Sequence, residues 1–306
     1  MAWKIHVNDP LDEDAMKKLK SYENADVTVE HYDKETLKDT IGEMDAVVVR
    51  SATKIRREII ENAQKMKVIA RAGTGLDNID LDAAKEKGIE VVNTPGANSV
   101  SVAELTIGLM LSLFRHIPRG TNGLKNQLWE KKKLRGYELY KKTVGIIGFG
   151  TIGKEVAKRL LAFDCRIVAY DVVKDSGGLD VEFLELDQLY KEADIITVHT
   201  PLIDATKGLI DDAAFKKMKD DVFIIDAARG GILNEQALCD NIESGKVAGA
   251  ALDVYDVEPP TDELRKRLLS YDNVIGTPHI GASTFEAQKR VGEQIVENLM
   301  EALNKA

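Results

Sequence analysis

Three glycines, Gly148, Gly150 and Gly153, are spaced as G-x-G-x-x-G directly after the apolar run 143–147. An amphipathic stretch, 154–162, follows them. A strand, a glycine turn and a helix in this order direct free backbone N–H groups and the positive end of the helix at one point, where a pyrophosphate can bind. The pattern therefore predicts a dinucleotide-binding site.

The next apolar run ends at Asp171, where a carboxylate would accept hydrogen bonds from a ribose 2′-hydroxyl group. The same carboxylate would repel a 2′-phosphate, and Val172 and Val173 offer no arginine to receive one. The alternative is a tight turn followed by an aspartate that caps a loop. Because strand, turn, helix, second strand and acid occur in register, we expect NAD rather than NADP as the cofactor.

Hydride transfer from an alcohol to a nicotinamide needs a group that accepts the hydroxyl proton, and histidine, with a pKa of about 6.5, suits this task. His199 and His279 adjoin the Thr-Pro pairs 200–201 and 277–278, which end predicted strands. We predict His279 as the proton acceptor because it lies on a predicted crossing between domains, and His199 as part of the nicotinamide pocket. The other histidines are expected to be structural or exposed: His6, His31 and His116.

Glu258 precedes two prolines, and it could hydrogen-bond to a histidine and hold its tautomer. An exposed glutamate before prolines usually has no such role. Arg229 follows the predicted strand 222–225, and its planar fork of donors matches a carboxylate. The alternative for Arg229 is an ion pair with a surface acid.

A second glycine loop, 71–75, lacks the third glycine, so we do not expect a second dinucleotide site there. The backbone N–H at Gly73 could instead hold a small carboxylate. Arg50 and Ser51 end another predicted strand, and Asn98 lies just before a long helix. Together these residues could receive a phosphate or a second anion, although Asn98 has a turn-forming role as its alternative.

The chain of 306 residues is long enough for two domains, and its net charge of −9 argues against nucleic acid or an anionic membrane as a partner. Cys165 and Cys239 show no metal-ligand spacing, so we expect buried thiols in a reducing compartment and no metal site. The N-terminus has no signal-peptide pattern, and the most apolar stretch, 105–114, is too short to span a bilayer. A cytoplasmic protein is expected.

Short apolar runs alternate with helical patterns along most of the chain. The first series has predicted strands at 3–7, 26–29, 46–49, 68–70 and 90–92, and helices at 12–20, 34–41, 55–65 and 80–87. The second has strands at 143–147, 166–170, 194–198, 222–225, 247–251 and 273–275. Strands that alternate with helices predict an α/β fold of two doubly wound parallel-sheet domains, the second a Rossmann dinucleotide-binding domain.

Two predicted helices connect the domains. The Thr-Pro pairs 94–95 and 277–278 are each followed by glycine and then by a capping box, at 101–104 and 283–286. We therefore expect the chain to cross along helices 100–118 and 283–304. The predicted substrate-binding domain is 1–97 with 283–306, and the NAD-binding domain is 98–282. Because helix 100–118 is apolar almost all round, we expect it between the domains and against a partner subunit in a homodimer or a tetramer.

Taken together, these segments resemble the NAD-dependent D-2-hydroxyacid dehydrogenases over nearly the whole chain. The resemblance rests on 49–53, 71–77, 98–104, 148–153, 198–202, 228–231, 251–254 and 277–284. It implies a catalytic arginine, glutamate and histidine at Arg229, Glu258 and His279. It also implies NAD contacts at Thr74, Thr151, Ile152, Asp171, Thr200, Ala227 and Asp253, the last facing the carboxamide. With these we expect Gly148, Gly150, Gly153, His199, Pro201, Ala228, Gly281 and Ala282 to line the cofactor site, and Arg50, Ser51, Gly73, Asn98, Arg229 and His279 to contact substrate.

The resemblance implies hydride transfer between C2 of a D-2-hydroxy acid and NAD, with His279 as the acid–base. The motifs look most like those of family members that oxidise 3-phospho-D-glycerate to 3-phosphohydroxypyruvate for serine biosynthesis, and Arg50 with Asn98 favours that phosphorylated substrate. Longer members carry a C-terminal regulatory domain, which we do not expect because the chain stops after the closing helix. Two alternatives stay open: a glyoxylate or hydroxypyruvate reductase with the same catalytic residues, and an NAD-sensing corepressor.

Overall fold

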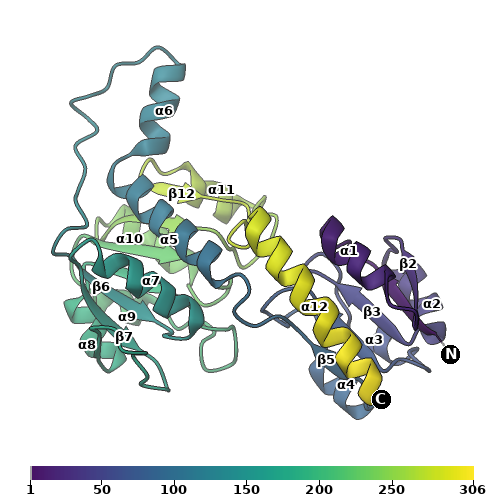
Figure 1. The fold of residues 1–306 in the computed structure, drawn as a ribbon. Coiled ribbons are helices and arrows are strands. Elements are labelled where there is room, and N and C mark those ends of the chain that lie inside the picture. The colour runs from purple at the N-terminus through teal and green to yellow at the C-terminus, as the bar shows by residue number, and fades with distance from the viewer. Residues whose placement is uncertain (1) are drawn as a thin grey trace. The chain divides into compact units, whose positions relative to one another are not determined.

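The computed structural model describes residues 2–306, and it divides into two compact units (Figure 1). Unit 1 comprises Met1–Asn98 with Ala282–Ala306, and unit 2 comprises Ser99–Gly281. Unit 1 has a five-stranded sheet and unit 2 a seven-stranded sheet, and every strand pair is parallel. The predicted α/β fold class, with two parallel sheets, is confirmed.

The sheet of unit 1 has the strand order β2-β1-β3-β4-β5. Its strands are β1 (Trp3–Val7), β2 (Ala25–Val29), β3 (Ala46–Val49), β4 (Val68–Arg71) and β5 (Glu90–Val92). Its helices are α1 (Glu13–Lys20), α2 (Lys34–Thr40), the 3-10 turn η1 (Ile41–Glu43), α3 (Arg57–Ile60), α4 (Leu81–Glu86) and α12 (Phe285–Lys305).

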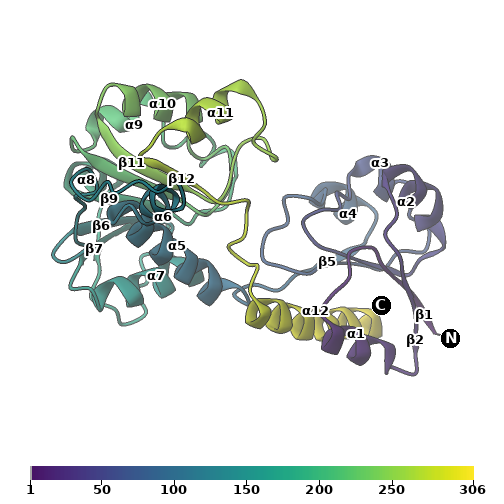
Figure 2. The same ribbon diagram turned by 90° about the horizontal axis from the view of Figure 1, so that it is seen from above.

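Alternate residues of β3 enter two separate cores, because successive side chains of a strand point to opposite faces. Ala46 and Val48 belong to the core under α1 and α12, and Val47 and Val49 to the core under α2, α3 and α4. In α12 the buried residues recur at helical spacing, and Figure 2 shows this helix running alongside α1. Both faces of the sheet are therefore covered, as a parallel sheet requires.

Two local predictions for unit 1 are wrong. The helix expected at 55–65 is only the single turn α3, because Ile55 pairs with Ile79 in a β-bridge and its backbone is bound to Asn78 and Asp80. The capping residue expected at Ser283 is Thr284, whose side chain accepts a hydrogen bond from the Ala287 N–H.

The sheet of unit 2 has the order β12-β11-β10-β9-β6-β7-β8. Its strands are β6 (Thr143–Ile147), β7 (Arg166–Tyr170), β8 (Glu182–Phe183), β9 (Ile195–Val198), β10 (Val222–Asp226), β11 (Val247–Leu252) and β12 (Val274–Gly276). Its helices are α5 (Ser99–Phe114), α6 (Ile117–Lys125), α7 (Thr151–Leu161), α8 (Leu186–Glu192), α9 (Asp212–Lys217), α10 (Glu235–Glu243) and α11 (Glu263–Ser270). The short edge strand β8 was not predicted. Helices α5 and α7 cover one face, and α8 to α11 the other. Strand order reverses at β6, where open α/β sheets bind their ligands.

The single helix predicted at 100–118 is wrong. The chain breaks at His116, which has the left-handed φ of 52°, and α6 continues at an angle of 62° to α5. Pro118, near the start of α6, cannot lie in a helix interior because it lacks an N–H. Since α5 begins at Ser99, Ser101 lies inside the helix and is not its cap.

The apolar side chains of α5, among them Ile107, Met110 and Phe114, are mostly buried within unit 2 itself. Across residues 2–306, no single helix is long and apolar enough to cross a membrane. The bent pair α5 and α6 reaches such a length and apolar composition only when the two helices are counted together.

Candidate active site

The candidate residues of unit 2 all follow strands of the seven-stranded sheet. In sheet order they are His279 after β12, Asp253 after β11, Arg229 after β10, His199 after β9, the glycine turn after β6 and Asp171 after β7. Because the strands are parallel, their carboxyl ends lie at one edge of the sheet. The sheet thus carries acid–base residues at one end of that edge and the glycine turn and Asp171 at the other.

His279 and Glu258 form a hydrogen-bonded pair. The Nδ1 atom of His279 lies 2.9 Å and 3.1 Å from the two carboxylate oxygens of Glu258. An ionised carboxylate only accepts hydrogen bonds, so Nδ1 carries a proton, and in the neutral ring Nε2 is the nitrogen with the free lone pair. Both side chains stay accessible, with exposed fractions of 44% and 39%. A fixed tautomer with an accessible Nε2 is the arrangement that a proton acceptor needs.

Asp253 holds the loop that carries His279. Its carboxylate accepts hydrogen bonds from the Thr277 hydroxyl (2.6 Å) and from the backbone N–H groups of Ile280 (2.8 Å) and Gly281 (2.8 Å). His279 itself has a left-handed φ of 51°, which costs free energy in a residue with a side chain. These bonds on both sides of His279 stabilise that conformation. Contact between Asp253 and the nicotinamide carboxamide stays a prediction.

The loop after β10 places Arg229 close to the backbone that precedes Glu258. A Cβ atom on Gly230 would lie 1.9 Å from the carbonyl oxygen of Tyr255, so only glycine permits this approach. The Arg229 guanidinium is half-buried and donates to the Ala228 carbonyl at 2.6 Å. At the start of this loop, burial raises the pKa of Asp226 to about 7, with Glu235 and Asp253 adding to the shift.

The glycine turn leaves an open approach to the N-terminus of α7. Gly148 has a φ of 93°, and Cβ atoms on Gly148 and Gly153 would lie within 2.6 Å and 2.3 Å of backbone atoms. At Gly150, by contrast, a Cβ would meet no atom within 4 Å, and no side chain caps the helix. Free N–H groups at a helix N-terminus beside open space fit a pyrophosphate.

Two side chains after β9 also fit a bound cofactor. His199 Nδ1 and Thr200 Oγ1 are buried polar atoms without a hydrogen-bond partner within residues 2–306, and a buried polar atom of this kind calls for a ligand or water. Burial lowers the pKa of His199 to about 3, so its ring is neutral and a poor base at neutral pH. This leaves His279 as the better proton acceptor of the two.

Asp171 is positioned by the glycine turn. Its carboxylate accepts hydrogen bonds from the backbone N–H groups of Phe149 (2.6 Å) and Val173 (2.9 Å). Each carboxylate oxygen has a further lone pair that a ribose hydroxyl can use.

Unit 1 brings together a second set of predicted residues at the carboxyl edge of its own sheet. Thr74 donates a hydrogen bond from its hydroxyl to the Asn98 side-chain oxygen at 2.8 Å, which ties Asn98 to the Gly73 turn. Gly73 has a φ of 143°, and a Cβ there would lie 1.6 Å from the Arg71 guanidinium. Arg71 therefore lies directly over the turn.

A protein-family model described as "D-isomer specific 2-hydroxyacid dehydrogenase, NAD binding domain" matches residues 107–281. A hydroxypyruvate reductase of Thermotoga maritima is 55% identical, with 98% of both chains covered. The chain belongs to the D-2-hydroxyacid dehydrogenase family. A D-3-phosphoglycerate dehydrogenase of Methanocaldococcus jannaschii is 48% identical over 98% of this chain, which spans only 57% of that relative's length. The crystal structure of a D-lactate dehydrogenase from Aquifex aeolicus, complexed with NAD and lactic acid, superimposes with a TM-score of 0.88 at 29% identity, covering 98% of this chain and 95% of that one.

NAD is accordingly the cofactor of this D-2-hydroxyacid dehydrogenase, and the glycine turn, His199, Thr200 and Asp171 are the residues whose geometry fits it. Sequence reasoning did not single out Arg71 as a site residue, although it stands two residues before Gly73 at the end of a strand. The signal available in the sequence was an arginine at the end of a predicted strand, directly before a glycine turn.

Proposed function

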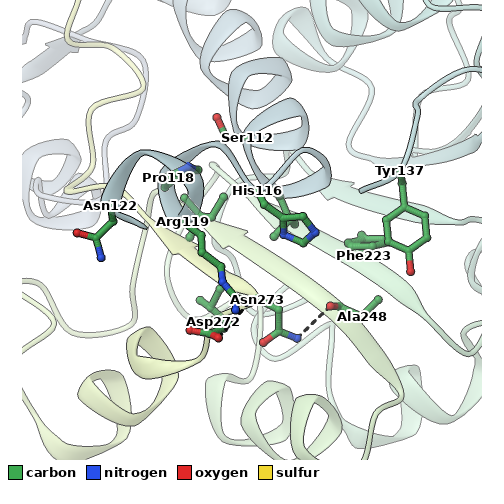
Figure 3. A pocket seen from close by; sticks show the side chains of 13 residues that line it. Ser112, His116, Pro118, Arg119, Asn122, Tyr137, Phe223, Ala248, Asp272 and Asn273 are labelled. Carbon is green, nitrogen blue, oxygen red and sulfur yellow. Dashed lines mark hydrogen bonds and ion pairs between the residues drawn. The ribbon is translucent and has the colours of Figure 1, made fainter. Parts of the chain in front are cut away.

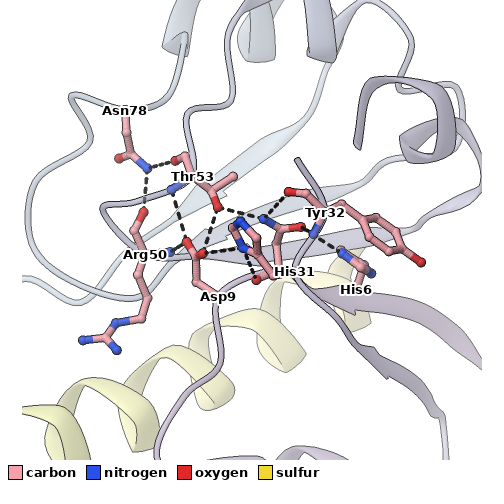
Figure 4. Close-up of polar contacts among 8 residues, drawn as sticks. His6, Asp9, His31, Tyr32, Arg50, Thr53 and Asn78 are labelled. Atoms are coloured by element: carbon pink, nitrogen blue, oxygen red, sulfur yellow. Dashed lines mark hydrogen bonds and ion pairs between the residues drawn. The ribbon is translucent and has the colours of Figure 1, made fainter. Parts of the chain in front are cut away.

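We propose that the protein oxidises 3-phospho-D-glycerate to 3-phosphohydroxypyruvate, a reaction of serine biosynthesis, in the cytoplasm. One observation carries the choice of a phosphorylated substrate. The half-buried guanidinium of Arg50 makes no hydrogen bond or ion pair with residues 2–306, although its backbone is held firmly (Figure 4). An uncompensated guanidinium suits a phosphate, which it can bind with two parallel hydrogen bonds. The buried free thiols of Cys165 and Cys239 support a reducing compartment.

In the proposed mechanism His279 takes the C2 hydroxyl proton at Nε2, while Glu258 holds the ring tautomer and stabilises the imidazolium. Arg229 binds the substrate carboxylate through its fork of donors. NAD, when bound, supplies the acceptor for the C2 hydride. Positioned proton transfer contributes about 10²–10⁴-fold to the rate, and orientation of the reacting groups can add several kcal/mol.

A second candidate is the reduction of hydroxypyruvate to D-glycerate, because the relative at 55% identity bears the name hydroxypyruvate reductase. Apart from their direction, the two candidate reactions differ only in a phosphate on the hydroxy acid and on the oxo acid. Steady-state kinetics with NAD and either 3-phospho-D-glycerate or D-glycerate separates them. Under our proposal kcat/KM is higher for the phosphorylated acid. An NAD-binding corepressor would bind the coenzyme without turnover of either acid.

The decisive variant is Arg50→Ala. We expect its KM for 3-phospho-D-glycerate to rise about tenfold or more, because a charge-assisted contact is worth about 1.5–3 kcal/mol. The KM for D-glycerate should change by less than about threefold. Equal changes in KM for both acids would contradict the assignment of Arg50 to the substrate phosphate.

We further propose a homodimer, formed through the segment 117–140 and not through α5. The large apolar side chains exposed on this segment are Ile117, Leu124, Leu128, Trp129, Tyr137 and Tyr140, and Trp129 is 81% exposed.

At the base of α6 a cavity of about 290 Å³ is lined by His116, Arg119, Tyr137 and Asp272, with Arg119 paired to Asp272 at 3.1 Å (Figure 3). No predicted catalytic or cofactor residue lines this cavity, and we include it in the proposed interface. Light scattering of the wild type and of Trp129→Lys should show a dimer and a monomer respectively.

A further inference from the structure

The loop that carries Arg50 is tied down by one buried carboxylate. Asp9, which follows β1, accepts hydrogen bonds from the backbone N–H of Arg50 (2.7 Å), the backbone N–H of Thr53 (3.3 Å) and the Thr53 hydroxyl (2.9 Å). Asp9 and Thr53 are 6% and 8% exposed. Because β1 and β3 are neighbours in the sheet, Asp9 reaches the whole loop 50–53 from one side (Figure 4).

Asn78 binds the other polar groups of the same loop. Its side-chain amide donates to the backbone carbonyls of Arg50 (2.7 Å) and Thr53 (2.6 Å). Asp9 and Asn78 together therefore satisfy the backbone N–H and C=O groups of both Arg50 and Thr53. Only Ser51 and Ala52, which are exposed, lie between these two fixed points.

Burial of the Asp9 carboxylate costs free energy, and the need to hold a surface loop does not by itself account for that cost. A buried carboxylate loses hydration, and it is tolerated only where hydrogen bonds or a charge compensate it. Among residues 2–306, the partners of Asp9 outside the loop reduce to the mostly exposed His31, whose Nδ1 lies 3.5 Å away, and the other partners all belong to the loop. A loop fixed before binding loses less conformational entropy when its side chain engages a ligand.

We propose that Asp9 and Asn78 are specificity-determining positioning residues, which fix the loop 50–53 so that Arg50 meets the phosphate of the substrate. This inference rests on the proposed function, since it assumes that Arg50 binds that phosphate. It assigns no part in proton transfer to either residue.

The test compares Asp9→Asn with the wild type on 3-phospho-D-glycerate and D-glycerate. The two backbone N–H groups bond to one oxygen of Asp9 and the Thr53 hydroxyl bonds to the other. The asparagine of this variant can accept the two N–H groups with its neutral amide oxygen, which is a weaker acceptor than a carboxylate, but its NH₂ group no longer accepts the Thr53 hydroxyl. We expect the KM for the phosphorylated acid to rise about tenfold, with kcat for both acids and the KM for D-glycerate within about threefold of wild type. Thr53→Val removes the hydroxyl that donates to Asp9 and accepts from the Asn8 side-chain amide. It should show a smaller change of the same kind, and it serves if Asp9→Asn folds poorly.

Asp12→Asn is the matched control, because Asp12 caps α1 in the same unit and does not contact the loop. It should leave both KM values unchanged. The double variant Asp9→Asn/Arg50→Ala should have the same KM for 3-phospho-D-glycerate as Arg50→Ala alone, since Asp9 acts through Arg50.

Two failures can be told apart. If Arg50→Ala is selective for the phosphorylated acid but Asp9→Asn is not, or if the two effects add in the double variant, the positioning role is overturned. If Arg50→Ala itself affects both acids equally, the proposed substrate is overturned, and the positioning role with it.

Discussion

The loop that carries His279 in unit 2 and the loop that carries Arg50 in unit 1 are held in the same way. In each, a buried aspartate at the end of the neighbouring strand accepts two backbone N–H groups and one threonine hydroxyl from the loop. Asp253 does so after β11 and Asp9 after β1. The two sheets have unrelated loop sequences at these places, so the shared geometry follows from parallel strands that end side by side.

The loops differ in what holds the functional side chain. His279 has a second partner, Glu258, which fixes the ring itself. The Arg50 guanidinium makes no hydrogen bond or ion pair with residues 2–306, and only its backbone is held. Proton transfer requires an atom placed to within a fraction of an ångström, while recognition of a charge needs only a cation within reach. Under the proposed function, a fixed backbone serves both tasks, and a fixed side chain is added only for proton transfer.

The largest effect should come from His279→Ala. Loss of the proton acceptor should lower kcat by at least about a hundredfold, while NADH binding, followed by its fluorescence, should persist. Glu258→Gln keeps the size of the partner but lets Nδ1 lose its fixed proton, so we expect a smaller loss of kcat. If His279→Ala still turned over substrate at the wild-type rate, His279 would not be the proton acceptor. The difference between the His279 loop and the Arg50 loop would then disappear.

Asp253→Asn should have the next largest effect, and it is the counterpart of Asp9→Asn. Ile280 and Gly281 donate to different oxygens of Asp253, so the NH₂ group of an asparagine must face one of these two N–H groups. The left-handed conformation of His279 then loses part of its support, and we expect kcat to fall about tenfold. Thr277→Val, which removes one of the three bonds, should cost less. Asp9→Asn is expected to change KM and to leave kcat nearly unchanged. If Asp253→Asn did the same, Asp253 and Asp9 would serve one task, and the difference drawn between their loops would be wrong.

The smallest effect concerns stability. Asp226, whose backbone carbonyl accepts from the Asp253 N–H, has a pKa raised to about 7 by burial, against about 4 when unfolded. Between these values the folded state keeps a proton that the unfolded state has released, so stability falls as pH rises through this window. Asp226→Asn lacks this penalty and can still accept from the Ala228 N–H.

The melting temperature of Asp226→Asn relative to wild type should therefore be higher by about 2 °C or more at pH 8 than at pH 5. A difference that does not change with pH would show that the carboxyl group titrates normally.

Much of the fold follows from local sequence. Strands β1, β3, β5, β6 and β7 lie where the sequence pattern predicts them. In β3 and β6 the reason is clear, because strands buried on both faces are nearly continuously apolar. The two-residue strand β8 has no such apolar run. The helix breaks at His116 because this one residue adopts a left-handed conformation within an otherwise helical pattern. Local patterns could not find either feature, since both depend on how neighbouring elements pack.

The sequence by itself determined the chemical types at the site: the glycine turn, the acid at Asp171, and the histidine, glutamate and arginine after three later strands. Only the tertiary structure decided that Glu258 binds Nδ1 of His279, that Arg71 lies over Gly73, and that Asp9 and Asn78 hold the loop of Arg50. The physical reason is that spacing along the chain fixes which edge of a sheet a residue reaches, whereas hydrogen bonds between loops depend on which strands are neighbours in the sheet, and that order is set by packing of the whole unit.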